Sequence, residues 1–271
     1  WAEFGKVKSN KNKLFEFHKK LRMLTFFDPA CGCGNFLVIS YRELRELELA
    51  VLRASHVTGQ LSVDVHQLIG IDVDQFYGIE IEEFPAQIAQ VAMWLMDHQM
   101  NLQVSEEFGL YFARIPLRTS PHVVHDNALR LDWNEVLPAQ RCSYVLGNPP
   151  FVGKQHQTLA QKADVAPLYD KLEGGGVLDF VAAWYIKAAD YLLGNTLAGF
   201  VSTNSIVQGE QVGVLWSWML AQGMHIHFAH RTFRWSNEAS GKAAVHCVII
   251  GFGATTPVVR TIYEYDAVDS E

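Results

Sequence analysis

The residues with the clearest chemical purpose lie in the segment Gly147-Asn148-Pro149-Pro150-Phe151, which follows a short apolar run at 144–146. The nitrogen of an exocyclic amino group is a poor nucleophile, because its lone pair is delocalised into the ring. The Asn148 side-chain carbonyl and the Pro149 backbone carbonyl could accept both N–H groups and favour a pyramidal nitrogen. The prolines would hold this geometry rigidly, and the Phe151 ring could stack on a flat base. The segment predicts a site that activates an amino group, with an ordinary tight turn as the alternative.

A second candidate segment, Asp28-Pro29-Ala30-Cys31-Gly32-Cys33-Gly34, follows another apolar run at 24–27. Two glycines separated by one residue let the backbone approach a ligand and turn N–H groups toward it. A third glycine would complete the phosphate-binding pattern of dinucleotide sites, but Leu37 stands at that position. The segment therefore predicts a ligand without phosphate groups at the carboxyl end of a strand.

Acidic residues mark the ends of two further predicted strands. Glu80 lies near the end of the segment 77–81, where a carboxylate could accept hydrogen bonds from both hydroxyls of a ribose. A similar acidic run lies at 71–74, but Glu80 is preferred because a clean helical pattern follows it directly. Asp126 follows the segment 122–125 and could bind the amino edge of an adenine ring.

Apolar β runs alternate with amphipathic helical stretches, which is the pattern of a parallel sheet covered by helices. The predicted strands are 24–27, 77–81, 122–125, 144–146, 197–202, 224–229 and 243–252, and the predicted helices are 35–53, 85–100, 178–193 and 208–222. The segment 151–176 is expected to be a loop, and 54–75 is an insertion without a predicted structure.

Composition limits the class of protein. The chain has 271 residues, 49% of them apolar, which suffices for one large α/β domain or two small ones. No apolar stretch approaches the ~20 residues that a membrane helix needs, and without a signal peptide a cytoplasmic protein is expected. None of the four cysteines belongs to a C-x-x-C pair, so neither zinc nor a disulfide framework is expected.

Charge is unevenly distributed along the chain. The net charge of −7 argues against a free-standing nucleic-acid binder. Residues 1–22 carry seven basic and two acidic side chains, which leaves 15 basic and 27 acidic residues in the rest of the chain. Since the sequence also begins without a methionine, we interpret it as a piece of a longer protein.

Together these motifs resemble the amino-methyltransferase branch of the class I family, which depends on S-adenosylmethionine. Four segments of this chain resemble four motifs of that family. In order they are Asp28-Pro29-Ala30-Cys31-Gly32-Cys33-Gly34-Asn35-Phe36, Gly78-Ile79-Glu80-Ile81, Asp126-Asn127-Ala128 and, for the catalytic motif, Asn148-Pro149-Pro150-Phe151. The order of cofactor motif before catalytic motif resembles the gamma class. The chain is similar to the methyltransferase portion of single-chain restriction-modification enzymes of the MmeI kind.

The resemblance implies a Rossmann-like α/β fold with a seven-stranded, mostly parallel sheet, an antiparallel last strand and helices on both faces. It implies S-adenosylmethionine as cofactor and no metal for methyl transfer. The implied cofactor-binding residues are Asp28, Pro29, Ala30, Cys31, Gly32, Gly34, Glu80, Ile81, Asp126, Asn127 and Trp184. Trp184 would wall the cofactor adenine, with a core aromatic as the alternative. The implied catalytic residues are Asn148, Pro149, Pro150 and Phe151, and the target base would stack on Phe151 and on Phe233, with Trp235 as the competing candidate.

The implied function is methylation of an exocyclic amino group, adenine N6 before cytosine N4, on a base flipped out of double-stranded DNA. We expect a basic helical lead-in at 1–23, a methyltransferase domain at 24–253 and the start of a linker toward a recognition domain at 254–271. The family's further cofactor motif is not found in 1–23, which puts activity of the piece alone in doubt. The alternatives are an RNA or protein-glutamine methyltransferase, and a non-catalytic cofactor-fold module that binds DNA. Membrane association is not expected, and the oligomeric state is left open.

Overall fold

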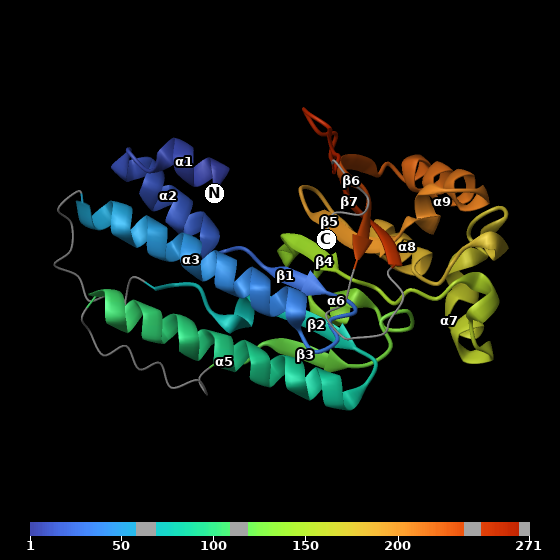
Figure 1. Ribbon diagram of the computed structural model, residues 1–271, viewed down its shortest axis with the longest axis horizontal. Coiled ribbons are helices and arrows are strands. Elements are labelled where there is room, and N and C mark those ends of the chain that lie inside the picture. The colour runs from blue at the N-terminus through green and yellow to red at the C-terminus, as the bar shows by residue number, and fades with distance from the viewer. Residues whose placement is uncertain (58–68, 109–118, 236–244, 266–271) are drawn as a thin grey trace. The chain divides into compact units, whose positions relative to one another are not determined.

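The computed structural model describes residues 1–57, 69–108, 119–235 and 245–265, and the chain divides into two compact units (Figure 1). The first unit holds Trp1–Phe27 and Cys31–His125, and the second holds Asp28–Ala30 and Asp126–Glu271. Among the described residues no helix combines the length and apolar character needed to cross a membrane.

The first unit alternates strands with long helices. Its elements are α1 (Ala2–Val7), α2 (Lys11–Leu21), β1 (Phe26–Asp28), α3 (Asn35–Val57), the 3₁₀ turn η1 (Val73–Gln75), β2 (Phe76–Glu80), α5 (Glu83–Phe108) and β3 (His122–His125). The strand order is β3-β2-β1, and β2 pairs in parallel with β3 from Tyr77↔His122 to Glu80↔His125. Asp28, the last residue of β1, counts with the second unit.

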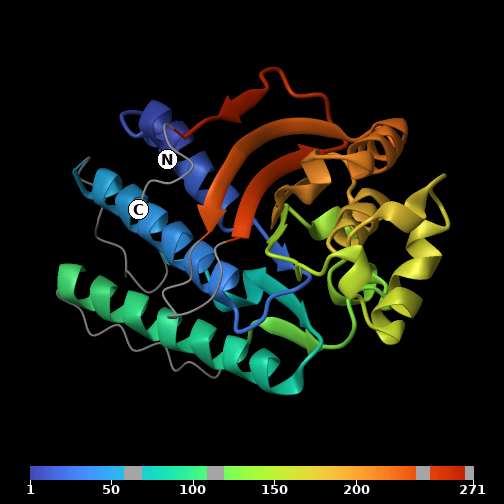
Figure 2. The same cartoon turned by 45° about the vertical axis from the view of Figure 1, so that its right-hand side comes forward.

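Helices α3 and α5 run side by side in the same direction (Figures 1 and 2). Three contacts set this direction, since Tyr41 bonds Asp97, Arg45 bonds Asn101 and Arg53 bonds Glu107. Helix α2 packs on α3 through the buried residues Leu14, Phe17 and Leu21 and through a 2.9 Å contact of the His18 ring with the Glu48 carboxylate.

The second unit carries the antiparallel part of the fold. Its helices and strands are α6 (Trp133–Val136), β4 (Tyr144–Gly147), α7 (Leu159–Tyr169), α8 (Ala182–Tyr191), β5 (Leu197–Thr203), α9 (Glu210–Ala221), β6 (His225–Trp235), β7 (Val245–Gly253) and β8 (Thr261–Tyr263), and its 3₁₀ turns are η2 (Ala139–Arg141), η3 (Lys154–His156), η4 (Gly175–Val177) and η5 (Asn204–Val207). The strand order is β4-β5-β7-β6-β8. Strand β4 is parallel to β5, whereas β7 is antiparallel to both β5 and β6 (Figure 2).

The core of the second unit is aromatic. The Tyr185 ring of α8 lies 5.4 Å from the Phe200 ring of β5, 5.3 Å from the Phe252 ring of β7 and 5.7 Å from the Trp216 ring of α9. These contacts fix α8 and α9 against β5 and β7, which lie between β4 and β6 in the strand order.

The predicted fold class, a mostly parallel α/β sheet with antiparallel pairing near the end, is confirmed. The strand count differs, because the described residues form eight strands where seven were predicted. The extra strand is β8, which pairs in parallel with β6 at Phe228↔Thr261. Strand β6 also runs to Trp235, six residues beyond its predicted end.

The expectation of a loop across 151–176 is wrong, because α7 occupies Leu159–Tyr169. The helix begins with a capping box in which the Thr158 hydroxyl accepts a hydrogen bond from the Gln161 N–H and the Gln161 side chain accepts one from the Thr158 N–H. Part of the insertion predicted at 54–75 lies outside the described residues.

Candidate active site

From Cys31 onward, the glycine segment belongs to the first unit. Its two glycines have backbone conformations that other residues rarely adopt. Gly32 has φ +55° and Gly34 has φ +86°, both in the left-handed region. A Cβ atom on Gly34 would lie 2.9 Å from the Cβ of Ala89 on α5. The second glycine therefore allows α3 to start close against α5.

Glu80 ends β2 and is oriented by two backbone donors. Its carboxylate accepts a 2.9 Å hydrogen bond from the Gly32 N–H and a 3.0 Å bond from the Glu82 N–H. An ionised carboxylate has about four acceptor positions, so two remain for hydroxyl groups of a ligand. The next residue, Ile81, is 56% exposed and offers an apolar surface beside them.

The competing acid Asp72 has a structural role. Its carboxylate caps η1 by accepting a 2.7 Å hydrogen bond from the Val73 N–H, and it accepts a second 2.7 Å bond from the Thr119 hydroxyl. This use of Asp72 agrees with the preference for Glu80.

In the second unit, the buried Asp28 carboxylate lies beside the end of β4. Its Oδ1 accepts a 3.0 Å hydrogen bond from the Ala30 N–H, and a Cβ atom on Gly147 would come within 2.5 Å of the same oxygen. Gly147 is therefore required for Asp28 to reach this place. The buried Trp184 donates its indole N–H to the Pro29 carbonyl at 3.1 Å and so holds the same loop.

Asn148 follows β4, and its side-chain oxygen is the distinctive feature of the site. Gly147, the last residue of β4, pairs with Phe200 in the middle of β5, so Asn148 leaves the sheet at the carboxyl end of β4. Its Oδ1 is buried and accepts no hydrogen bond from any residue that the structure describes. A buried acceptor without a partner is costly, so a donor from a ligand or a water would stabilise it. Pro149 is buried, and Phe151 is half-buried.

Asp126 and Asn127 differ in what they can offer a ligand. The Asn127 side chain is occupied at both ends, since its oxygen accepts from the Leu129 N–H and its amide donates to Asp164 of α7, each at 2.9 Å. Asp126 is exposed, and its Oδ1 accepts from the Asn127 N–H at 2.6 Å. Asp126 is therefore the better candidate for an adenine contact.

The strand register locates the second stacking candidate. Phe233 pairs with Cys247 of β7, which pairs with Thr203, the last residue of β5. Phe233 therefore lies within β6, level with the carboxyl end of β5. Its ring is 5.7 Å from the ring of Tyr265. The side chain of the competing Trp235 lies outside the described residues.

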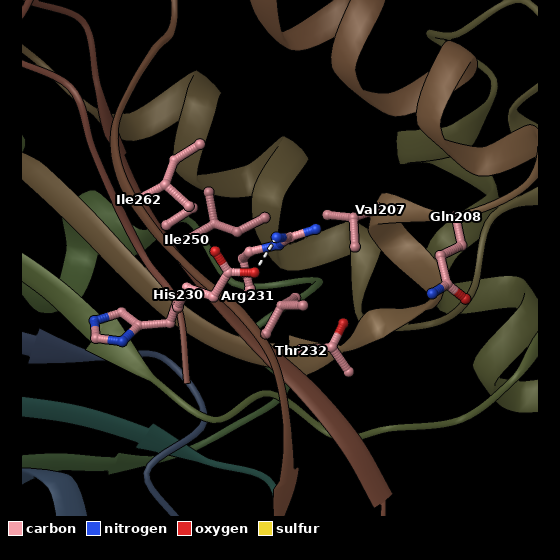
Figure 3. A pocket seen from close by; sticks show the side chains of 10 residues that line it. Val207, Gln208, His230, Arg231, Thr232, Ile250 and Ile262 are labelled. Carbon is pink, nitrogen blue, oxygen red and sulfur yellow. Dashed lines mark hydrogen bonds and ion pairs between the residues drawn. The ribbon is translucent and has the colours of Figure 1, made fainter. Parts of the chain in front are cut away.

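An open pocket of about 680 Å³ lies on β6 just before Phe233 (Figure 3). An Arg231–Glu264 ion pair crosses it. The other residues that line it include Val207, Gln208, His230, Thr232, Ile250 and Ile262. Burial lowers the pKa of His230, so this side chain is mainly neutral near pH 7.

Two of the four cysteines are poorly suited to act as thiolate nucleophiles. Burial raises the pKa of the Cys247 thiol to about 11 and that of Cys142 to about 12. Within the described ranges, no group of three or more His, Cys, Asp or Glu side chains is arranged to hold a metal ion.

Comparison with known proteins decides the family. The description "MmeI, DNA-methyltransferase domain" belongs to a family model that matches residues 4–264. The chain belongs to the MmeI DNA-methyltransferase domain family. This confirms the resemblance found in the sequence, and it favours DNA over RNA or protein glutamine.

Individual relatives of the MmeI family agree. DNA methyltransferase A of Bacillus subtilis (strain 168) is 38% identical over 266 residues, which is 95% of this chain and 29% of that protein. The Type IIL restriction-modification enzyme MmeI, solved in complex with DNA, is 63% identical with a TM-score of 0.95 over all of this chain and 36% of that one. The Type ISP enzyme LlaGI, with 15% identity and a TM-score of 0.54 over 89% of this chain and 21% of that one, shares the fold. The chain thus spans about a third of the length of its two nearer relatives described here.

Proposed function

We propose that this chain transfers a methyl group from S-adenosylmethionine to the exocyclic amino group of a base, adenine N6, in double-stranded DNA. The observation that carries the proposal is the buried Asn148 Oδ1, which accepts no hydrogen bond from the described residues and directly follows β4. Membership of the MmeI DNA-methyltransferase family supports it. The solved MmeI structure contains DNA, which supports DNA as the partner here and a restriction-modification protein as the setting.

The residues present fit S-adenosylmethionine. The glycine segment 28–36 contains no lysine or arginine, as suits a cofactor without phosphate groups. Glu80 keeps acceptor positions for ribose hydroxyls, Ile81 offers an apolar contact for the adenine ring, and Asp126 can accept from the adenine amino group. Asp28, Ala30, Gly32 and Gly34 would line the methionine part, and Trp184 would contribute through its bond to Pro29. When bound, S-adenosylmethionine supplies an electrophilic methyl group.

The catalytic turn prepares the acceptor nitrogen. The target base must leave the duplex to reach Asn148. The Asn148 Oδ1 and the Pro149 carbonyl would accept hydrogen bonds from the two amino N–H groups and direct the nitrogen lone pair away from the ring. Phe151 would stack on one face of the base, and Phe233 is the candidate for the other. The mechanism needs no general base, because the nitrogen loses its proton readily once it is methylated.

Substitution of Asn148 tests the proposal directly. In the protein that carries this chain, we expect Asn148→Ala to lower kcat for DNA methylation by about 10²–10³, because the lost hydrogen bond acts mainly in the transition state. The affinity for S-adenosylmethionine, measured by calorimetry, should stay unchanged. A turnover near that of the unmodified protein would remove Asn148 from the catalytic role. Absence of methylation by the unmodified protein would instead favour a non-catalytic DNA-binding module.

Product analysis identifies the base, and Phe151→Ala is the matched comparison. Mass spectrometry of digested DNA should show N6-methyladenine. N4-methylcytosine would change only the base, whereas 5-methylcytosine would contradict the mechanism. Phe151→Ala should raise KM for DNA as well as slow turnover, because stacking holds the base in the ground state too, by roughly 1–3 kcal/mol.

A further inference from the structure

The loop that follows Phe151 is fastened to a segment 25 residues further along the chain. The Phe180 N–H donates a 3.0 Å hydrogen bond to the Val152 carbonyl. One residue earlier, the Asp179 carboxylate accepts a 2.8 Å bond from the Lys154 N–H through Oδ1. The Asp179 side chain thus adds a second hydrogen bond between the loop after Phe151 and the segment at 179–180.

Asp179 is in turn held by the start of α9. Its second carboxylate oxygen accepts a 3.0 Å hydrogen bond from the Gln211 side-chain amide, and its own N–H donates a 2.9 Å bond to the Gln211 side-chain oxygen. The Asp179 carbonyl accepts a 2.5 Å bond from the Tyr169 hydroxyl of α7. Four segments of the second unit therefore meet at this half-buried residue, and each of its polar groups has a partner.

The position of Phe151 depends on anchors on both sides. Upstream, Gly147 is fixed by pairing with Phe200, and two prolines restrict the backbone. Downstream, the anchors are the bonds at Val152 and Lys154. Loosening the downstream anchor would let Phe151 move while Asn148 stays next to its strand.

We propose that Asp179 and Gln211 are positioning residues for the target base, because they fix the loop that presents Phe151. This inference rests on the proposed function of the Asn148 turn. Neither residue is proposed to touch the reacting nitrogen. They would contribute to the binding of the flipped base. Substituting them should therefore change KM for DNA more than the affinity for the cofactor.

The donor and the acceptor of the hydrogen bond between the Asp179 and Gln211 side chains can be exchanged by substitution, which gives a rescue test. In D179N, an amide would face the donating amide of Gln211, and in Q211E two carboxylates would face each other. In the D179N/Q211E double variant, the amide at position 179 donates to the carboxylate at position 211, while the oxygen at position 179 still accepts from Lys154. The net charge is the same as in the unmodified protein.

We expect each single variant, made in the complete protein, to raise KM for DNA about tenfold, as for residues of one hydrogen-bond network. The affinity for S-adenosylmethionine should stay unchanged, and the double variant should return KM to within about twofold. With 2-aminopurine at the target position, the fluorescence gain on base flipping should fall in the single variants and recover in the double variant. D190N is the matched control, since Asp190 pairs with Lys171 at 2.6 Å on exposed surface and should leave KM unchanged.

Several results would overturn the inference. Single variants with unchanged KM, or a double variant no better than the worse single one, would show that the pair does not position the base. If D179N does not fold, Gln211→Met takes its place and should also raise KM. Absence of any DNA methylation by the unmodified protein would refute the proposed function itself, a result distinct from an active enzyme that tolerates these changes.

Discussion

Asn127 and Asn148 both follow a parallel strand closely, yet their side chains have different uses. Asn127 has protein partners for its oxygen and its amide, whereas the Asn148 Oδ1 accepts nothing from the described part of the chain. In the proposed mechanism, the amino group of the target base supplies the donor that this buried acceptor lacks. The chemistry of the site therefore depends on which polar groups the protein leaves without an internal partner.

Glu80 allows a quantitative test of the cofactor assignment. We expect Glu80→Ala to weaken binding of S-adenosylmethionine by about 1.5–3 kcal/mol, because it removes charge-assisted bonds to the ribose. Glu80→Gln should lose less, since its side-chain oxygen can still accept from the Gly32 N–H. Calorimetry measures both, with Glu82→Ala as control because that exposed neighbour orients Glu80 only through its backbone. Equal affinity of the Glu80→Ala variant would exclude this carboxylate from the cofactor site.

Local spacing predicted the candidate residues but not their partners. The Asn-Pro-Pro-Phe segment, the two glycines and Glu80 are contiguous signals at strand ends, so a single sequence reveals them. The contacts of Asn127 with Asp164, 37 residues away, and of Lys154 with Asp179, 25 residues away, arise only from tertiary packing. No signal near Asp179 or Gln211 marked either residue, because an isolated acid or amide is common on a surface.

At the scale of elements, α3 and α5 are joined by a buried polar network. The Arg45 guanidinium donates to the Tyr41 hydroxyl at 2.7 Å, to Asp97 at 3.1 Å and to Asn101 at 3.0 Å. Burial raises the pKa of Tyr41 well above its ordinary value, so its hydroxyl keeps its proton and donates to Asp97. The network fixes the register of the two helices that follow β1 and β2.

Removing one member of this network should be costly. We expect Asp97→Ala to lower the free energy of unfolding by about 3–5 kcal/mol, because it removes the nearer of the two buried carboxylates beside the fully buried Arg45, at 3.1 Å against 3.6 Å for Glu48. Arg53→Ala, which breaks an exposed pair with Glu107 between the same helices, should cost about 1 kcal/mol or less. Urea denaturation followed by circular dichroism measures both. If the two variants lost similar free energies of unfolding, burial would not determine how much these ion pairs stabilise the protein.

The prediction of elements failed where local and tertiary signals conflict. Helix α7 has a capping signal in Thr158 and Gln161, but it contains Pro167 and is followed by the glycines at 174–176, which are typical of loops. Strand β8 is three residues long and has exposed side chains at Ile262 and Tyr263, so its sequence shows no alternation of apolar and polar residues that would predict a strand. It exists because β6 offers an edge for pairing. By contrast, β3 was predicted at its observed bounds, since a short apolar run there is closed by Asp126.

At the scale of the whole molecule, the net charge of the chain has the same sign as that of the proposed partner, DNA. The chain has a net charge of −7, and its excess of basic residues is confined to the first 22 positions. A phosphate backbone is attracted by lysine and arginine, so this balance gives little sequence-independent affinity for DNA. The relatives that match are about three times as long, which leaves room in such proteins for other segments that bind DNA.

The 271-residue chain alone should therefore bind duplex DNA weakly and with little sequence preference. We expect a Kd in the range of non-specific complexes, ~10⁻⁴ to 10⁻⁶ M near physiological salt, and tighter binding as salt is lowered. Fluorescence anisotropy with two unrelated duplexes at about 50 and 150 mM salt measures this. The salt dependence is informative in itself, because its slope counts the phosphates that the few basic residues neutralise. Sequence-selective binding near ~10⁻⁸ M would contradict the expectation and place the recognition surface within this chain.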